Sequence, residues 1–115
     1  MTNSKRLCLA LDLRDDAAAI AEYDRIHAAG AVPAPVNANL RSAGIIDMEI
    51  WRVANRLVMI CEVTETFDGF GQADHSNAEI RAWDVLTSSL QSPIDGADAV
   101  GWAEMRRVYN LADQA

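Results

Sequence analysis

The chain has 115 residues, of which half are apolar and 23% are charged, and its formal net charge is −7. This length and composition are those of one globular domain, so residues 1–115 are interpreted as a single domain. The negative charge, together with the lack of any run of Lys or Arg, argues against nucleic acid and anionic membranes as partners.

Two cysteines, Cys8 and Cys61, lie inside apolar runs. A disulfide scaffold of this size usually carries about four or more cysteines, so we expect two reduced, buried thiols. The N-terminus lacks the hydrophobic region and cleavage site of a signal peptide, and no segment has the length to span a bilayer. The sequence therefore indicates a cytoplasmic protein.

Alternating leucines predict a half-buried strand over residues 6–13. An Ala-rich helix follows, with Asp15 or Asp16 as its cap and Gly30 as its expected end. Because residues three and four apart share a helix face, the phenol of Tyr23 and the imidazole of His27 are expected to point the same way. The full stripe consists of Ile20, Tyr23, Ile26 and His27.

Two prolines, Pro33 and Pro35, interrupt the next segment. A regular helix cannot run through both, but a short one can begin at Pro35 and end at Gly44. Apolar runs at 45–51 and 56–63 then predict two strands of a hairpin, whose turn contains Asn55, a residue that tolerates the left-handed conformation.

The segment "TETFDGFGQADHS" predicts a loop because of its Gly, Asp and Ser content. In the helix predicted over residues 76–91, Ser76 and Glu79 have the spacing of a capping box. A final strand is predicted over 102–111, with Trp102 at its start. The apolar stripe of the helix consists of Ile80, Trp83, Leu86 and Leu90.

These elements predict an α+β fold in the order strand, helix, strand, strand, helix, strand. That order is the ferredoxin-like split βαβ arrangement, a four-stranded antiparallel sheet with helices on one face. Both faces of the strand at 56–63 are largely apolar, so the other face of the sheet also needs a cover. A second copy of the same sheet is the simplest cover, which predicts a homodimeric α+β barrel.

The common nucleotide and metal motifs are missing from the sequence, including the Gly-rich dinucleotide loop, the P-loop, C-x-x-C and H-E-x-x-H. With two histidines and no cysteine cluster, we expect no metal site. His75 lies in a polar stretch before a helix and is interpreted as an exposed loop residue.

Two interpretations of Tyr23 and His27 are open: amphipathic residues at the rim of the core, or a pair that faces a pocket. Imidazole exchanges protons near neutral pH, and a nearby phenol can position a hydroxyl group. Trp83 and Trp102 are either core residues or flat surfaces against which the apolar face of a sugar can pack.

The chain resembles the L-rhamnose mutarotase family along nearly its whole length. The resemblance is carried by an ordered set of short motifs, none of which is specific alone. They are "Y-x-x-x-H" (Tyr23 and His27), "GIIDMEIW" (44–51), "NRLVMICEV" (55–63), "WDVL" from Trp83 and "WAEMRRVYNL" (102–111).

The resemblance implies a dimeric ferredoxin-like barrel and a sugar-converting isomerase that needs no cofactor or metal. It implies that His27 is the proton donor and that Tyr23 and Trp83 bind the sugar. Trp102 is a further candidate for sugar binding, from its aromatic face alone. The sequence departs from the family where a "W-P-E" segment usually follows the histidine, and where aromatic residues usually occupy positions 48 and 82, here Met48 and Ala82.

The implied reaction interconverts the α and β anomers of a 6-deoxyhexose such as L-rhamnose or L-fucose. It needs an acid for the ring oxygen, assigned here to His27, and a base for the anomeric hydroxyl. Asp47, Glu49 or a bound water are open as the base, and strand alternation places both carboxylates on the same face as Trp51. Two alternatives are a cofactor-independent monooxygenase-like barrel enzyme and a non-catalytic ligand-binding protein.

Overall fold

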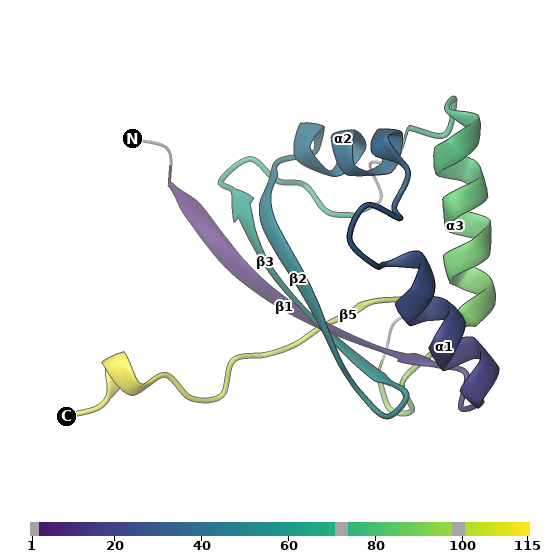
Figure 1. The fold of residues 1–115 in the computed structure, drawn as a ribbon. Helices are drawn as coiled ribbons and strands as arrows, with labels where there is room; N and C mark the ends of the chain where they lie inside the picture. Colours follow the sequence, from purple (N-terminus) through teal and green to yellow (C-terminus); the bar gives the residue numbers. More distant parts are fainter. Residues whose placement is uncertain (1–2, 71–73, 98–100) are drawn as a thin grey trace.

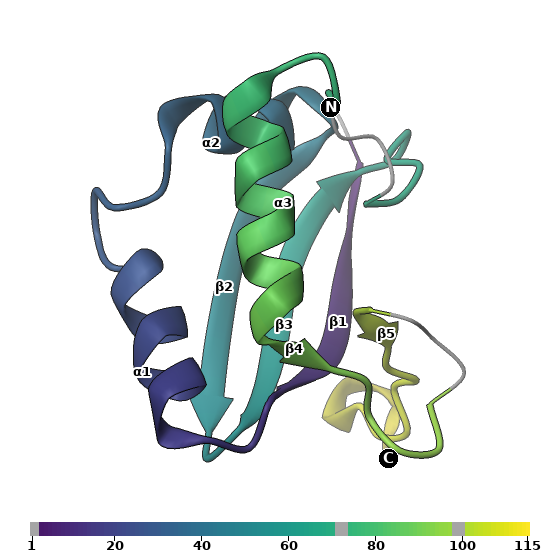
Figure 2. The ribbon, with the colours of Figure 1, turned by 90° about the vertical axis from the view of Figure 1, so that its right-hand side faces the viewer.

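The chain folds into a curled antiparallel sheet that is covered on one face by three helices (Figure 1). This arrangement is seen in a computed structural model that describes residues 3–70, 74–97 and 101–115. The predicted α+β class and ferredoxin-like topology are confirmed. The second view shows the helices lying side by side across the sheet (Figure 2).

Three long strands make up most of the sheet, and two short strands complete it. The strands, in their order across the sheet, are β2 (Ile45–Val53), β3 (Arg56–Thr64), β1 (Ser4–Leu13) and β4 (Gln91–Ser92). A fifth strand, β5 (Ala103–Glu104), also pairs with β1, and every pairing is antiparallel. The strands β1 and β3 therefore lie at the centre of the sheet.

The helices are α1 (Ala17–Ile26), α2 (Ala34–Ser42) and α3 (Ala78–Leu90). Within the described ranges, no helix has the length and apolar character needed to cross a membrane. The second helix, predicted from Pro35 to Gly44, is confirmed with its start one residue earlier. Pro35 lies in its first turn, where a missing N–H is tolerated.

Helix α1 ends before Gly30, contrary to the prediction, and the reason is the side chain of His27. Asp16 caps the start of the helix, with its carboxylate accepting from the backbone N–H of Ala19 at 2.7 Å. At the other end, His27 Nδ1 lies 2.8 Å from the carbonyl oxygen of Tyr23. In a continued helix, the Tyr23 carbonyl oxygen would accept from the backbone N–H of His27. Here the imidazole bonds to that oxygen instead, and the backbone N–H of His27 donates to the carbonyl oxygen of Arg25.

Two other predicted local features are wrong in detail. Asn77, not Ser76, caps α3, because its side-chain oxygen accepts from the N–H groups of Glu79 and Ile80 at 2.9 and 3.1 Å. In the hairpin between β2 and β3, Ala54 takes the positive φ (50°) predicted for Asn55. The Asn55 amide is used elsewhere, since it donates to the carbonyl oxygen of Leu13 at 3.0 Å.

The predicted strand over 102–111 is much shorter in the structure. Only Ala103 and Glu104 pair with β1, and the pairing ends where the Met105 N–H donates to Cys8 O at 2.7 Å. The chain then leads away from the sheet on the side opposite the helices (Figure 1) and ends in a short 3₁₀ turn, Leu111–Asp113. Residues 105–111 pair with none of the described strands.

The two faces of the sheet differ in burial. On the helix-facing side, Leu11, Leu13, Leu57, Cys61 and Val63 are almost fully buried. The opposite side, which we call the open face, consists of the alternate residues, and there Val58 and Ile60 are half-buried while Trp51 is 62% exposed. Both thiols are free, but only Cys61 is buried, because Cys8 lies half-buried on the open face.

Candidate functional site

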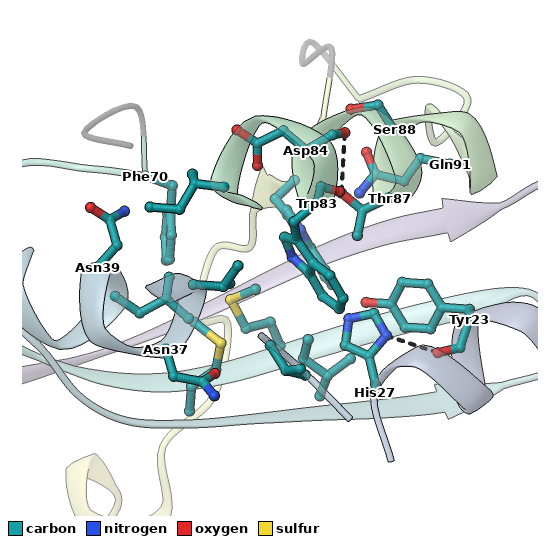
Figure 3. Close-up of a pocket in the computed structure, with 18 residues that line it drawn as sticks. Tyr23, His27, Asn37, Asn39, Phe70, Trp83, Asp84, Thr87, Ser88 and Gln91 are labelled. Carbon is teal, nitrogen blue, oxygen red and sulfur yellow. Dashed lines mark hydrogen bonds between the residues drawn. The ribbon is translucent and has the colours of Figure 1, made fainter. Parts of the chain in front are cut away.

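A cavity of about 630 Å³ lies between the sheet and all three helices. Its floor is formed by helix-facing strand side chains, and its walls by the C-terminal end of α1 and by one side of α2 and of α3 (Figure 3). All four residues selected from the sequence, Tyr23, His27, Trp83 and Trp102, line this one cavity. Segments far apart in the sequence therefore converge here.

His27 is held in one orientation by its own helix. The ring stacks on Tyr23, with centroids 4.0 Å apart and planes 26° apart, and Nδ1 is paired with the Tyr23 carbonyl oxygen. Since a carbonyl only accepts, Nδ1 carries the proton in this hydrogen bond. The other ring nitrogen, Nε2, is left for the cavity, as Figure 3 shows.

Burial sets the protonation state of both aromatic groups. Desolvation lowers the pKa of His27 below its ordinary 6.5, while its bond to the Tyr23 carbonyl and the charge of Asp24 oppose this effect. Burial also raises the pKa of Tyr23 well above its ordinary value, so the phenol keeps its proton and can donate it in a hydrogen bond. At neutral pH the pair presents a neutral imidazole and a neutral phenol.

Asp24 connects this end of α1 to the sheet. Its carboxylate receives two hydrogen bonds from the Arg52 guanidinium, at 2.9 and 2.6 Å, and Arg52 also donates to Ala54 O. The hydrogen bond with Arg52 lowers the pKa of Asp24, so this carboxylate stays charged next to Tyr23 and His27. The turn that carries the imidazole is thus tied to the β2–β3 hairpin.

The two tryptophans occupy different positions in the cavity. Trp83, on α3, meets His27 edge to face with centroids 5.0 Å apart and planes at 64°. Trp102 lies directly before β5 and packs against the buried apolar side chains of the core. Both are half-buried, so each indole is part of the core and also presents a surface to the cavity.

The carboxylates considered as the base do not reach the cavity. The strand register places Asp47 opposite Glu62 and Glu49 opposite Ile60, on the open face with Trp51. Met48 and Ile50, the alternate residues of β2, point to the cavity instead. The interpretation of Asp47 and Glu49 as bases is therefore wrong for this cavity, although their shared face with Trp51 is confirmed.

His75 lies outside the cavity wall and is exposed, as expected. Its Nε2 is 3.8 Å from the Asp84 carboxylate across the start of α3. Among residues 3–70, 74–97 and 101–115, no three His, Cys, Asp or Glu side chains are grouped to hold a metal ion.

Several polar residues of the cavity were not selected from the sequence. On α3 and just beyond it, Thr87, Ser88 and Gln91 follow Trp83 and Asp84 at helical spacing, so extending the aromatic stripe to polar residues would have found them. The α2 amides gave no such signal, because polar residues on a short helix usually face solvent. The missed polar residues are Asn37, Asn39, Asp84, Thr87, Ser88 and Gln91.

Comparison with known proteins gives a consistent result. The family model described as L-rhamnose mutarotase matches residues 6–111 of this chain. An L-fucose mutarotase from Xanthomonas campestris pv. campestris is 40% identical over 112 residues, which cover 95% of this chain and 90% of that protein. The crystal structure of an L-rhamnose mutarotase from Formosa agariphila has a similar fold, with a TM-score of 0.58 at 14% identity. That match covers 93% of this chain and 98% of the other.

Proposed function

Because the chain belongs to the L-rhamnose mutarotase family, we propose that it interconverts the α and β anomers of a 6-deoxyhexose such as L-rhamnose or L-fucose. It is accordingly an isomerase that acts on carbohydrates. The observation that supports this most is the fixed imidazole of His27 at the wall of the cavity, with its second ring nitrogen toward the interior.

Ring opening requires two proton transfers. A proton leaves the anomeric hydroxyl, the bond between C1 and the ring oxygen breaks, and the ring oxygen receives a proton. Rotation about the C1–C2 bond and the reverse steps give the other anomer. In its imidazolium form His27 carries a proton on Nε2 as well as on Nδ1. It supplies the Nε2 proton to the ring oxygen and takes it back on closure. Such general acid catalysis contributes roughly 10²–10⁴-fold, and no cofactor or metal takes part.

The remaining groups hold the sugar in place. The protonated Tyr23 phenol donates a hydrogen bond to a sugar oxygen, and Trp83 and Trp102 pack against its C–H face. Met48, Ile50 and Met59 form an apolar floor that suits the methyl group of a 6-deoxy sugar. With Asp47 and Glu49 on the opposite side of the sheet, a water molecule in the cavity serves as the base.

The two alternatives receive no support from these comparisons. An apolar substrate of a monooxygenase-like enzyme would leave the amides, hydroxyls and carboxylate of this cavity without hydrogen-bond partners, whereas a sugar can satisfy them. A non-catalytic binding protein would not need an imidazole whose tautomer is fixed by a backbone carbonyl.

We propose a homodimer as the assembly and the cytoplasm as the location. The open face of the sheet carries an apolar patch, formed by Trp51, Val58 and Ile60, that a second copy would cover. Val108, in the C-terminal segment, is 89% exposed. The two free thiols, Cys8 and Cys61, are compatible with a reducing compartment.

The activity is tested by saturation-transfer NMR between the two anomeric protons of a panel of aldoses. We expect exchange to accelerate for L-rhamnose or L-fucose in proportion to protein concentration, and least for hexoses with a 6-hydroxyl group, because the floor of the cavity is apolar. No acceleration with any aldose would favour the non-catalytic alternative.

A further inference from the structure

The cavity is larger than one sugar ring requires. A 6-deoxyhexose has about eleven non-hydrogen atoms and fills roughly 200 Å³ at the packing density of organic crystals. The cavity has about 630 Å³. A monosaccharide that reacts at His27 therefore leaves a large part of the cavity empty.

The empty part lies at the end away from His27. In Figure 3, Tyr23, His27 and Gln91 gather at one end, Asn39 and Phe70 lie at the other, and the Trp83 ring stands between them. The Asp84 carboxylate is directed toward the Phe70 end rather than toward His27. We call the region formed by Asn39, Phe70 and Asp84 the distal region.

The distal region contains the groups that recognise a sugar. Phe70 is 37% exposed, and its ring is held by an edge-to-face contact with Phe67 at 5.0 Å. A fixed, exposed aromatic face can pack against the C–H face of a pyranose. Asn39 offers a donor and an acceptor, and Asp84 offers two acceptor oxygens, which together match several sugar hydroxyl groups.

The distal polar groups are free to take a ligand. Within the described part of the chain, the Asn39 side-chain amide forms no hydrogen bond, and the carboxylate of Asp84 meets only His75, at 3.8 Å. An apolar ligand would leave both groups desolvated without partners, which is unfavourable. A ligand that carries hydroxyl groups would satisfy them.

We propose that the distal region is a second sugar subsite, so that the substrates include short reducing oligosaccharides whose reducing end is the 6-deoxyhexose. This inference rests on the proposed function, because it places the reducing ring at His27. The second ring then lies on Phe70, and its hydroxyl groups bind Asn39 and Asp84. The chemistry at the anomeric carbon is unchanged, since a reducing disaccharide keeps its free anomeric hydroxyl.

The test compares anomeric exchange for L-rhamnose with that for disaccharides that carry a second sugar on O2, O3 or O4 of a reducing L-rhamnose. L-Fucose and its disaccharides replace them if L-fucose is the faster monosaccharide. At least one disaccharide is expected to match or exceed the monosaccharide in kcat/KM. Phe70→Leu and Asn39→Ala should each lower kcat/KM for that disaccharide about tenfold and leave the monosaccharide within about twofold.

Arg41→Ala provides the matched control, because Arg41 lies on α2 but is exposed and outside the cavity wall. Arg41→Ala should change kcat/KM for neither the monosaccharide nor the disaccharide. Acceleration of the monosaccharide with no disaccharide accelerated would overturn the second subsite and leave the proposed function intact. Equal losses for both substrates in the Phe70 and Asn39 variants would also overturn it. No acceleration of any sugar would contradict the proposed function itself.

Discussion

At the scale of single residues, burial and one backbone carbonyl determine the protonation and the orientation of the Tyr23 and His27 side chains. The Tyr23 carbonyl fixes the tautomer of His27, and the Tyr23 ring supports the imidazole from one side. The same few atoms end helix α1 at this point. The hydrogen bond at the end of the helix is thus the same one that orients the imidazole for the proposed proton transfer.

The contribution of the Tyr23 hydroxyl group can be tested separately from that of the ring. In Tyr23→Phe the ring still fills its buried position and stacks on His27, so the thermal stability should remain close to that of the wild type. The lost hydrogen bond to the sugar is worth about 1 kcal/mol, so kcat/KM should fall roughly fivefold to tenfold. Tyr23→Ala should instead lower the free energy of unfolding by about 3–5 kcal/mol, because it opens a cavity in the core. Wild-type kinetics in Tyr23→Phe would remove the phenol from the site.

The protonation of His27 can be followed directly by NMR. Burial lowers its pKa, so the Hε1 shift of His27 should titrate with a midpoint below 6.5. Asp24 favours the charged imidazole, so Asp24→Asn should move that midpoint further down. Glu22→Gln, on the same helix but paired with Arg25, is the control and should leave it unchanged. An upward shift in Asp24→Asn would contradict the assigned electrostatics.

How far the residues of the site follow from the sequence depends on their spacing. Tyr23 and His27 were predictable because helical periodicity places them together and their chemistry is distinctive. Asn37 and Asn39 were not, since nothing in a nine-residue polar helix shows that it closes a cavity. Asp47 and Glu49 were misassigned because alternation shows that two residues share a face but not which face has the cavity.

At the scale of secondary structure elements, the segment between α1 and β2 supplies one wall of the cavity, through helix α2. Two prolines permit this short helix, and Gly44 turns the chain into β2 with φ of 107°. The backbone at Gly44 therefore connects the helix to the sheet.

Gly44→Ala should therefore destabilise the protein. A Cβ atom at this position would lie 2.6 Å from Thr64 Oγ1, and an L-residue is strained at this φ. We expect a loss of about 2–3 kcal/mol in the free energy of unfolding, measured with denaturant. Gly30→Ala is the matched control, since its φ is also positive but its Cβ would meet nothing within 4 Å. Its loss should be smaller, about 1 kcal/mol. Equal losses would show that the contact with Thr64 is unimportant.

At the scale of the whole molecule, the main difference between prediction and structure lies at the C-terminus. The sequence of 102–111 predicts a strand, yet of these residues only Ala103 and Glu104 pair with β1. A pattern shows that a segment suits a sheet, but the pairing depends on which neighbour is available. The exposed Val108 and Leu111 are consistent with a neighbour supplied by another chain.

The dimer itself is tested by light scattering. The wild type should have twice the 12.5 kDa mass of one chain. Ile60→Glu puts a further negative charge in the apolar patch of the open face, opposite Glu49, and should give the mass of a single chain, because unpaired like charges at an interface are strongly unfavourable. Ile60→Val keeps the face apolar and should remain dimeric. A wild-type mass of 12.5 kDa would contradict the proposed assembly.

The most direct test of the central claim, that the His27 imidazole transfers the proton, is the rate of anomeric exchange in two matched variants. The chain contains two histidines, and only His27 lines the cavity. His27→Asn should lower the protein-dependent exchange of the preferred 6-deoxyhexose by about 100-fold or more while the fold is retained, as checked by circular dichroism. His75→Asn should leave it unchanged. Exchange that persists at the wild-type rate in folded His27→Asn would contradict the account.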